Sequence, residues 1–138
     1  SRLDVAATSL GLAQAALDAA TRWAKDRLVG GEPLAARQGV QWTLADMKLR
    51  LECAWALTLQ ATALRGAGLD FTLQSAMAKL YASEMVGFVT DAALQLHGGY
   101  GYTREMPLER YVRDARILRI YEGASEIQRT IIARAVLA

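Results

Sequence analysis

Cysteine, proline, histidine and lysine are all scarce in this sequence of 138 residues. The single cysteine, Cys53, excludes an internal disulfide and favours a reducing, cytoplasmic compartment, and its small apolar neighbours predict a buried thiol. Prolines occur only at Pro33 and Pro107, so long helices can form between them. The longest charge-free runs, residues 5–17 and 53–64, are too short to span a bilayer, so we predict no membrane segment.

Charge is nearly balanced, with 16 basic and 14 acidic residues and a net charge of +2. That surplus is too small to predict nucleic-acid binding. Of the basic residues 13 are arginines, which suits ion pairs and the recognition of carboxylates or phosphates, although a GC-rich genome would produce the same bias. Five arginines and three acidic residues fall within residues 104–119, which predicts a salt-bridged helix face rather than a nucleic-acid surface.

Apolar residues recur at helical spacing along almost the whole chain. One seam runs from Leu3 to Ala24 in steps of three and four, and a second runs from Val40 to Ala61. Glycines and Pro33 separate these two segments, which predicts a break between two long helices.

Three further helices are predicted in the second half of the chain. A long one should begin at a cap formed by Asp70 or Thr72 and extend to His97. Two shorter helices should cover residues 108–119 and the segment from Ser125 to the C-terminus, with a capping box at residues 125–128. Because no stretch shows sustained strand alternation, we predict one all-α domain over residues 1–138, an up-and-down helical bundle of three long and two shorter helices.

Two carboxylates interrupt the apolar pattern of the third predicted helix. Glu84 and Asp91 recur on one stripe with Leu80, Phe88 and Gln95. A buried carboxylate requires a partner, so we expect arginines from neighbouring helices to pair with both in a structural role.

The segment 97–102 (His-Gly-Gly-Tyr-Gly-Tyr) is the first candidate for a site. Glycines that follow a helix allow backbone N–H groups to approach an anion, although a helix cap followed by a turn is the simpler interpretation. No strand precedes the glycines, which argues against a dinucleotide-binding fingerprint. His97 has no cysteine or histidine cluster beside it, so we predict a capping or supporting role for it and no metal site.

The segment 121–126 (Tyr-Glu-Gly-Ala-Ser-Glu) is the second candidate. Glu122 lies in a short link between two helices, where a carboxylate can simply complement the dipole of the following helix. Flanked by Ile120 and Tyr121, it can also be partly desolvated, as a general base acting on a weak carbon acid requires. Residue patterns alone leave both interpretations open.

The motifs taken together resemble the C-terminal domain of the acyl-CoA dehydrogenase family, along essentially the whole chain. The matching residues are 95–102, Pro107, Glu109-Arg110, 113–116 and 120–123, with 11–16, 44–47 and Ala78-Lys79 upstream. Family members have three domains, so the resemblance implies that an N-terminal helical domain and a middle β-domain are absent here. The isolated chain is therefore expected to be inactive.

The resemblance implies an FAD-dependent oxidoreductase of fatty acid metabolism that dehydrogenates an acyl-CoA thioester to a trans-2-enoyl-CoA. In that reaction a carboxylate removes the α-proton while the β-hydrogen leaves as hydride to flavin. Glu122 matches this base, and Tyr121 and Gly123 match residues that line the acyl pocket. Some members place the base directly before an arginine on the first helix. Arg2 matches that arginine and is assigned to substrate binding, whereas Ser1 cannot serve as a base.

Flavin contacts carry over from the same resemblance. Arg27 matches a contact to the FAD pyrophosphate and Gln38 a contact on the adenine side. Further contacts match Gln95, Leu96, His97, Gly98 and Gly99 towards the flavin of a neighbouring subunit, and Ala124, Ser125 and Glu126 at the start of the last helix. Two positions depart from the family pattern: Gly30-Gly31 replaces Phe-Gly, and Ala124 replaces threonine.

The resemblance also implies partners: an acyl-CoA substrate, an electron-transfer flavoprotein or similar acceptor, and a second copy of the chain in a homodimer or homotetramer. Two alternatives are an acyl-CoA oxidase that passes electrons to oxygen, and a non-catalytic helical interaction module derived from the family. The intact Tyr121-Glu122-Gly123 argues against the module, whereas Gly30 and Ala124 favour it slightly.

Overall fold

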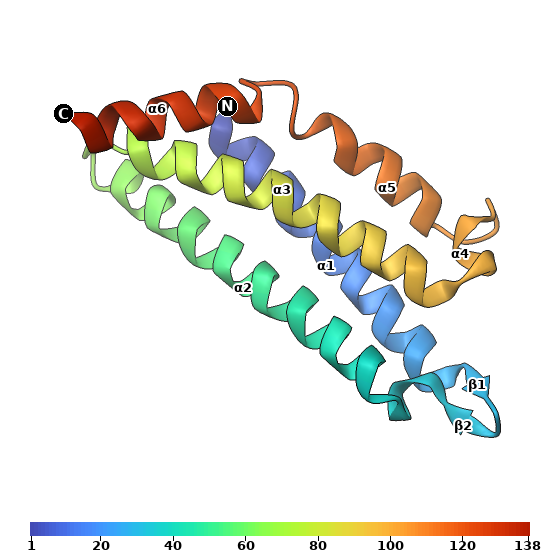
Figure 1. The fold of residues 1–138 in the computed structure, drawn as a ribbon. Helices are drawn as coiled ribbons and strands as arrows, with labels where there is room; N and C mark the ends of the chain where they lie inside the picture. The colour runs from blue at the N-terminus through green and yellow to red at the C-terminus, as the bar shows by residue number, and fades with distance from the viewer.

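Three long helices form the body of the protein in a computed structural model that describes residues 1–138 (Figure 1). Helices α1 (Arg2–Asp26), α2 (Gln38–Gly66) and α3 (Thr72–His97) run up and down beside one another. The shorter helices are α4 (Gly99–Tyr102), α5 (Leu108–Ile117) and α6 (Ser125–Leu137). The predicted all-α bundle is therefore confirmed, with α4 as an additional single turn.

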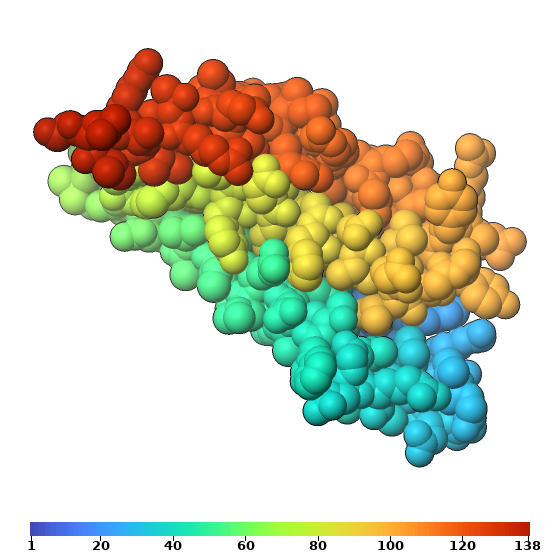
Figure 2. Space-filling view, in the orientation of Figure 1, coloured from blue at the N-terminus to red at the C-terminus, as the bar shows by residue number.

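Helix α3 is the central element, because it packs against α1, α2, α5 and α6. Figure 2 shows the segment from α5 to the C-terminus as a continuous orange-to-red layer along one side of α3. No helix combines the length and hydrophobicity that a membrane crossing requires.

The predicted helical seams form the core. Every seam position from Leu3 to Ala24 is buried, and the second seam is buried from Met47 to Ala61. Many of these positions are alanine, which lets neighbouring helices approach closely. Cys53 does not belong to this core: it is exposed on α2 beside the buried Leu51 and Ala54, so the predicted buried thiol is wrong.

A small hairpin joins α1 to α2, which the sequence pattern did not predict. Strands β1 (Leu28–Val29) and β2 (Glu32–Pro33) pair antiparallel, and the 3-10 turn η1 (Leu34–Ala36) follows. The two turn residues, Gly30 and Gly31, have φ angles of 63° and 83°. Two successive positive φ values are what a tight hairpin turn requires, and glycine adopts them without strain.

The two predicted helix caps differ from the structure. At the start of α3 the N-cap is Phe71, and the carboxylate of Asp70, one residue earlier, accepts a hydrogen bond from the Thr72 backbone N–H at 3.1 Å. At the start of α6 there is no capping box: the N-cap is Ala124, and the Ser125 hydroxyl instead donates to Glu84 Oε1 at 2.9 Å.

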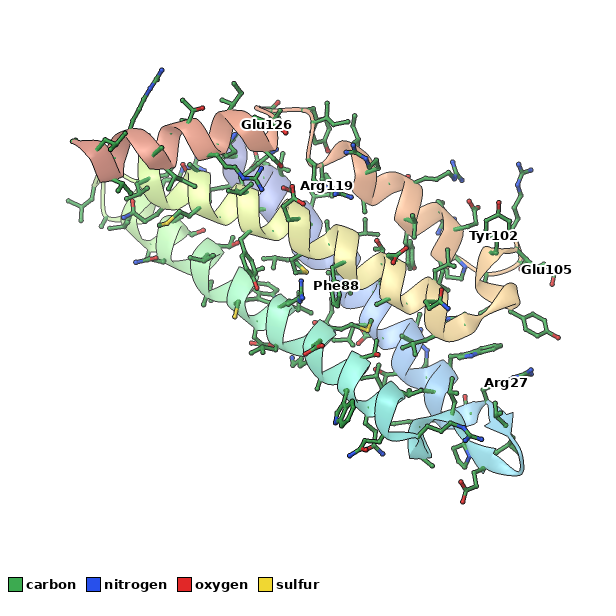
Figure 3. The ribbon with its side chains drawn as sticks, in the orientation of Figure 1. Arg27, Phe88, Tyr102, Glu105, Arg119 and Glu126 are labelled. Carbon is green, nitrogen blue, oxygen red and sulfur yellow. The ribbon has the colours of Figure 1, made fainter.

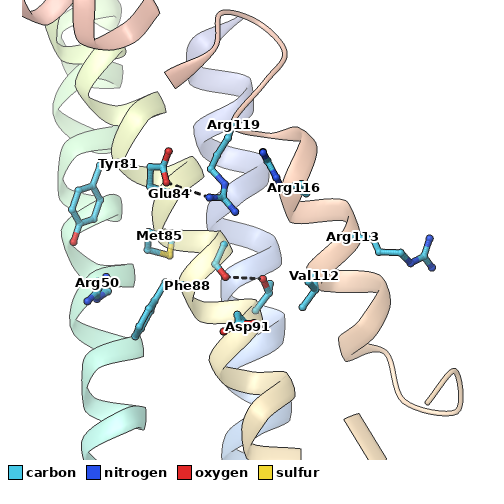
Figure 4. Close-up of a pocket in the computed structure, with 12 residues that line it drawn as sticks. Arg50, Tyr81, Glu84, Met85, Phe88, Asp91, Val112, Arg113, Arg116 and Arg119 are labelled. Atoms are coloured by element: carbon cyan, nitrogen blue, oxygen red, sulfur yellow. Dashed lines mark hydrogen bonds and ion pairs between the residues drawn. The ribbon is translucent and has the colours of Figure 1, made fainter. Parts of the chain in front are cut away.

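The carboxylate stripe of α3 is only half confirmed. Glu84 pairs with Arg119 at 3.5 Å, as expected, across a pocket of about 720 Å³ between α2, α3 and α5 (Figure 4). Asp91 lines the same pocket but is exposed and makes no ion pair, so its predicted burial is wrong.

Candidate functional site

Glu122 lies on the link between α5 and α6, where the backbone is in an unusual conformation. Its φ angle is +57°, the only positive value at a non-glycine residue, and Gly123 follows with a φ of +94°. Such backbone persists only where surrounding contacts impose it, and it often occurs at functional sites. The Glu122 side chain is 54% exposed and the flanking Ile120 and Tyr121 are also exposed, so the expected partial desolvation is not present in this chain.

The start of α1 lies beside this link. Arg2, Glu122 and Gly123 line one pocket of about 370 Å³, and the Ser1 amino group lies 3.2 Å from Glu122 Oε2. The structure therefore brings Arg2, from the start of the sequence, beside Glu122 and Gly123, which lie near its end. Tyr121 is separate from them, because its side chain lines a neighbouring hollow between α1 and α5.

Two buried side chains hold the Glu122–Gly123 backbone in place. Lys79 Nζ donates a hydrogen bond to the Gly123 carbonyl at 2.7 Å, and Gln128 Nε2 donates to the same oxygen at 3.1 Å. Lys79 is fully buried on α3, and this burial lowers the pKa of its ammonium group. The negative charges of Glu84 and Glu122 have the opposite, smaller effect on that pKa. Sequence reasoning placed Gln128 in a capping box and Lys79 among the residues that match the family, but it did not predict that either one contacts the link.

The predicted cofactor residues at the start of α6 differ in accessibility. Glu126 is exposed and Ala124 is half-buried. Ser125 is buried and both its groups are engaged: the hydroxyl donates to Glu84, and the backbone N–H donates to the Arg119 carbonyl at 3.0 Å. The Ser125 side chain therefore points into the bundle and not towards solvent.

A second group of predicted residues surrounds a pocket of about 540 Å³ at the opposite end of the bundle. Arg27 lines it from the end of α1, together with residues 95–99 from the end of α3. The Arg27 guanidinium lies over the rings of Trp23 and Tyr100, 5.6 Å from each centroid. Gln38, the first residue of α2, is exposed and does not line this pocket.

His97 forms the inner wall of that pocket. It is buried, its ring stacks on Trp23 at 4.8 Å between centroids, and its Nδ1 lies 2.7 Å from the Ala93 carbonyl. Because a carbonyl only accepts hydrogen bonds, Nδ1 carries the proton and Nε2 is the free acceptor. Burial lowers the pKa of His97, so it stays neutral near pH 7. This supporting role agrees with the expectation from the sequence.

The two groups of residues are far apart. Figure 3 shows Arg27 beside the hairpin and Glu126 near the other end of the bundle. At a rise of about 1.5 Å per residue, the stretch of α3 from Lys79 to His97 separates the two ends by about 27 Å.

Comparisons with known proteins agree with this architecture. Residues 1–137 match the family model described as acyl-CoA dehydrogenase, C-terminal domain. A mitochondrial short-chain specific acyl-CoA dehydrogenase of Rattus norvegicus is 52% identical over 132 residues, which is 96% of this chain and 32% of the relative. An acryloyl-CoA reductase (NADH) of Anaerotignum propionicum is 48% identical over 136 residues, 99% of this chain and 34% of the relative.

The solved structure of butyryl-CoA dehydrogenase from Megasphaera elsdenii superimposes with a TM-score of 0.98 at 42% identity, covering 99% of this chain and 36% of that one. The chain thus spans about a third of the length of these relatives. The match along nearly every residue confirms the resemblance found in the sequence: the chain belongs to the acyl-CoA dehydrogenase family and corresponds to its C-terminal domain.

Proposed function

We propose that residues 1–138 are the C-terminal domain of a larger flavoenzyme, with an N-terminal helical domain and a middle β-domain, that dehydrogenates an acyl-CoA thioester to a trans-2-enoyl-CoA. Glu122 is the base that removes the α-proton. The observation that carries this proposal is the fixed left-handed link, which presents a carboxylate at a pocket beside Arg2. An electron-transfer flavoprotein or similar acceptor completes the cycle.

The exposed Glu122 carboxylate suits a surface that the other domains cover. A carbon acid is deprotonated efficiently only by a base held at a fixed position, and the link supplies that rigidity. Arg2 places a positive charge in the same pocket, where it can orient a substrate carbonyl or amide. Gly123 leaves room for the Gln128 amide, which would lie 2.5 Å from a Cβ at that position, and Tyr121 lines a separate hollow on the α1 side.

The residues at the Arg27 end fit FAD. A guanidinium over two aromatic rings, beside the backbone of Gly98 and Gly99, provides a cation and close backbone approach for a pyrophosphate and flat surfaces for a ring system. When bound, FAD supplies the acceptor for the β-hydrogen. Arg27, Gln38 and residues 95–99 would hold FAD at this end, and Ala124 and Glu126 would contact the FAD of a second site at the other end.

The distance between the two ends supports an assembly of at least two copies. A base at one end and cofactor contacts about 27 Å away along α3 do not meet around one reaction centre within a single chain. We therefore propose a homodimer or homotetramer in which the Arg27 end of one copy binds the FAD that reacts at the Glu122 end of its partner.

The test of the base is Glu122→Gln in the full-length enzyme, with Glu105→Gln as the matched control on an exposed loop. Glutamine keeps the shape but cannot accept a proton, so anaerobic flavin reduction by acyl-CoA should slow by about 100- to 10,000-fold. The control should reduce its flavin at the wild-type rate. Rapid flavin reduction by Glu122→Gln would show that another group is the base.

A second candidate is the reverse reaction, reduction of a 2-enoyl-CoA, which the 48% identity to an acryloyl-CoA reductase favours. Glu122 would then deliver a proton to Cα instead of removing one, so the same residue serves both directions. An acyl-CoA oxidase is the third. Steady-state assays of the full-length enzyme with NADH and enoyl-CoA, with oxygen, or with a dye acceptor distinguish the three.

A further inference from the structure

Lys79 is the most deeply buried charged residue outside the proposed reaction machinery. Its side chain is fully buried on α3, and its amino group reaches the Gly123 carbonyl, 44 residues further along the chain, at 2.7 Å. No carboxylate lies within ion-pair distance of this ammonium, so its hydrogen-bond partner is a neutral backbone oxygen. An apolar side chain of similar length would fill the same space without the cost of burying a charge.

The carbonyl that Lys79 holds belongs to the link that carries Glu122. Glu122 and Gly123 have φ angles of +57° and +94°, a pair of values that an unconstrained chain adopts rarely. Gln128 Nε2 donates to the same carbonyl and lies so close to Gly123 that a Cβ there would come within 2.5 Å of it. The two donors and the glycine together fix one conformation of the link.

We propose that Lys79 is a positioning residue for Glu122: by holding the Gly123 carbonyl from inside the bundle, it fixes the left-handed link and aims the carboxylate at the substrate. This inference rests on the proposed function, because it requires Glu122 to be the base. Lys79 touches neither substrate nor cofactor and acts only through the backbone of the link.

The experiment compares Lys79→Met with Lys25→Met, both in the full-length enzyme. Methionine keeps the length and apolar stem of the side chain, and Lys25 is an exposed lysine in the last turn of α1. Because a displacement of about 1 Å at a reacting group lowers rates by about 100-fold, we expect kcat of Lys79→Met to fall by about 10- to 100-fold with little change in KM. Lys25→Met should match wild type in both.

Flavin content and melting temperature separate positioning from folding. Lys79→Met should keep the wild-type flavin content and melting temperature, because methionine replaces a buried charge by an apolar group. If it does not fold, Gln128→Leu tests the same carbonyl contact. The Gln128 Oε1 is buried without a partner, so leucine also removes an unsatisfied acceptor. We expect Gln128→Leu to lower kcat in a folded enzyme with flavin bound.

Each outcome decides between the two proposals. A wild-type kcat for folded Lys79→Met, or for Gln128→Leu if the first variant is unfolded, would overturn the positioning role while leaving the base intact. Rapid flavin reduction by Glu122→Gln would instead overturn the proposed function itself. A lower kcat with an unchanged KM in folded Lys79→Met, alongside an inactive Glu122→Gln, would support both.

Discussion

Replacing Gly123 by alanine should destabilise the fold more than the same change at other glycines with positive φ. An alanine Cβ at Gly123 would lie 2.5 Å from Gln128 Nε2, so the buried glutamine must move and release the Gly123 carbonyl. The left-handed backbone costs an alanine about 1–2 kcal/mol, and the lost hydrogen bond about 0.5–1.5 kcal/mol. We therefore expect Gly123→Ala to lower the free energy of unfolding by about 2–4 kcal/mol once the displacement of Gln128 is included.

Two glycines provide matched controls. Gly68 has a φ of +72° but nothing within 4 Å of an added Cβ, so Gly68→Ala reports the backbone strain alone, about 1–2 kcal/mol. Gly11 lies in α1 with open space around it, so Gly11→Ala should stabilise the chain by about 0.5–1 kcal/mol. Urea unfolding followed by circular dichroism gives all three values. If Gly123→Ala costs no more than Gly68→Ala, the contact with Gln128 does not constrain the link.

Two further predictions concern pH and the cofactor. Burial lowers the pKa of His97, so the unfolded chain binds a proton at a pH where the folded chain does not, and stability should fall as pH drops below about 6.5. His97 is the only histidine, so in thermal unfolding from pH 7 to 5.5 the His97→Gln variant should lose this slope; an unchanged slope would contradict the assignment. The isolated 138-residue chain should fold as a helical, colourless protein and bind FAD no better than micromolar, because it spans only about a third of its relatives' length and the proposed function places the rest of the flavin site in the other domains. A flavin that stays bound through gel filtration would refute this.

The helical architecture could be predicted because burial follows the helical period. Leu3, Leu10 and Leu17 recur in steps that return to one face, and the structure buries all three. The hairpin could not be predicted from periodicity, because strands of two residues are too short to show an alternation of apolar and polar side chains. Its signal was Gly30-Gly31 between Val29 and Glu32, a sequence that favours a tight hairpin turn.

The errors at single residues arise where a tertiary contact or the helix phase outweighs the local pattern. Ser125 fits a capping box, but Glu84 on α3 lies within reach and takes its hydroxyl. Cys53 has apolar sequence neighbours, but successive side chains on a helix point about 100° apart, and the Cys53 side chain is exposed to solvent.

The candidate site was predictable only in part. The sequence suggested a carboxylate on a link at Glu122, and the resemblance supplied the role. The contacts that fix the link could not be predicted, because Lys79 and Gln128 approach Gly123 from different helices. A lysine at a buried helical position signals a special environment, but its partner depends on how α6 returns onto α3.

The separation of the two ends of the bundle leads to a prediction about shared sites. If the Arg27 end of one copy serves the Glu122 end of its partner, each site in a dimer draws one residue from each chain. A mixed dimer of Glu122→Gln and Arg27→Ala chains then has one site with both defects and one site with none. If instead both residues served a site within one chain, every site in the mixed dimer would carry one defect.

Coexpression of differently tagged full-length Glu122→Gln and Arg27→Ala chains, followed by tandem purification, isolates the mixed assembly. For a dimer, one intact site of two predicts about half of the wild-type activity per assembly, well above either variant alone. Mixing the two purified homo-oligomers without subunit exchange is the control and should restore nothing. Activity of the mixed dimer equal to the mean of the two variants would show that Arg27 and Glu122 do not meet across a subunit boundary.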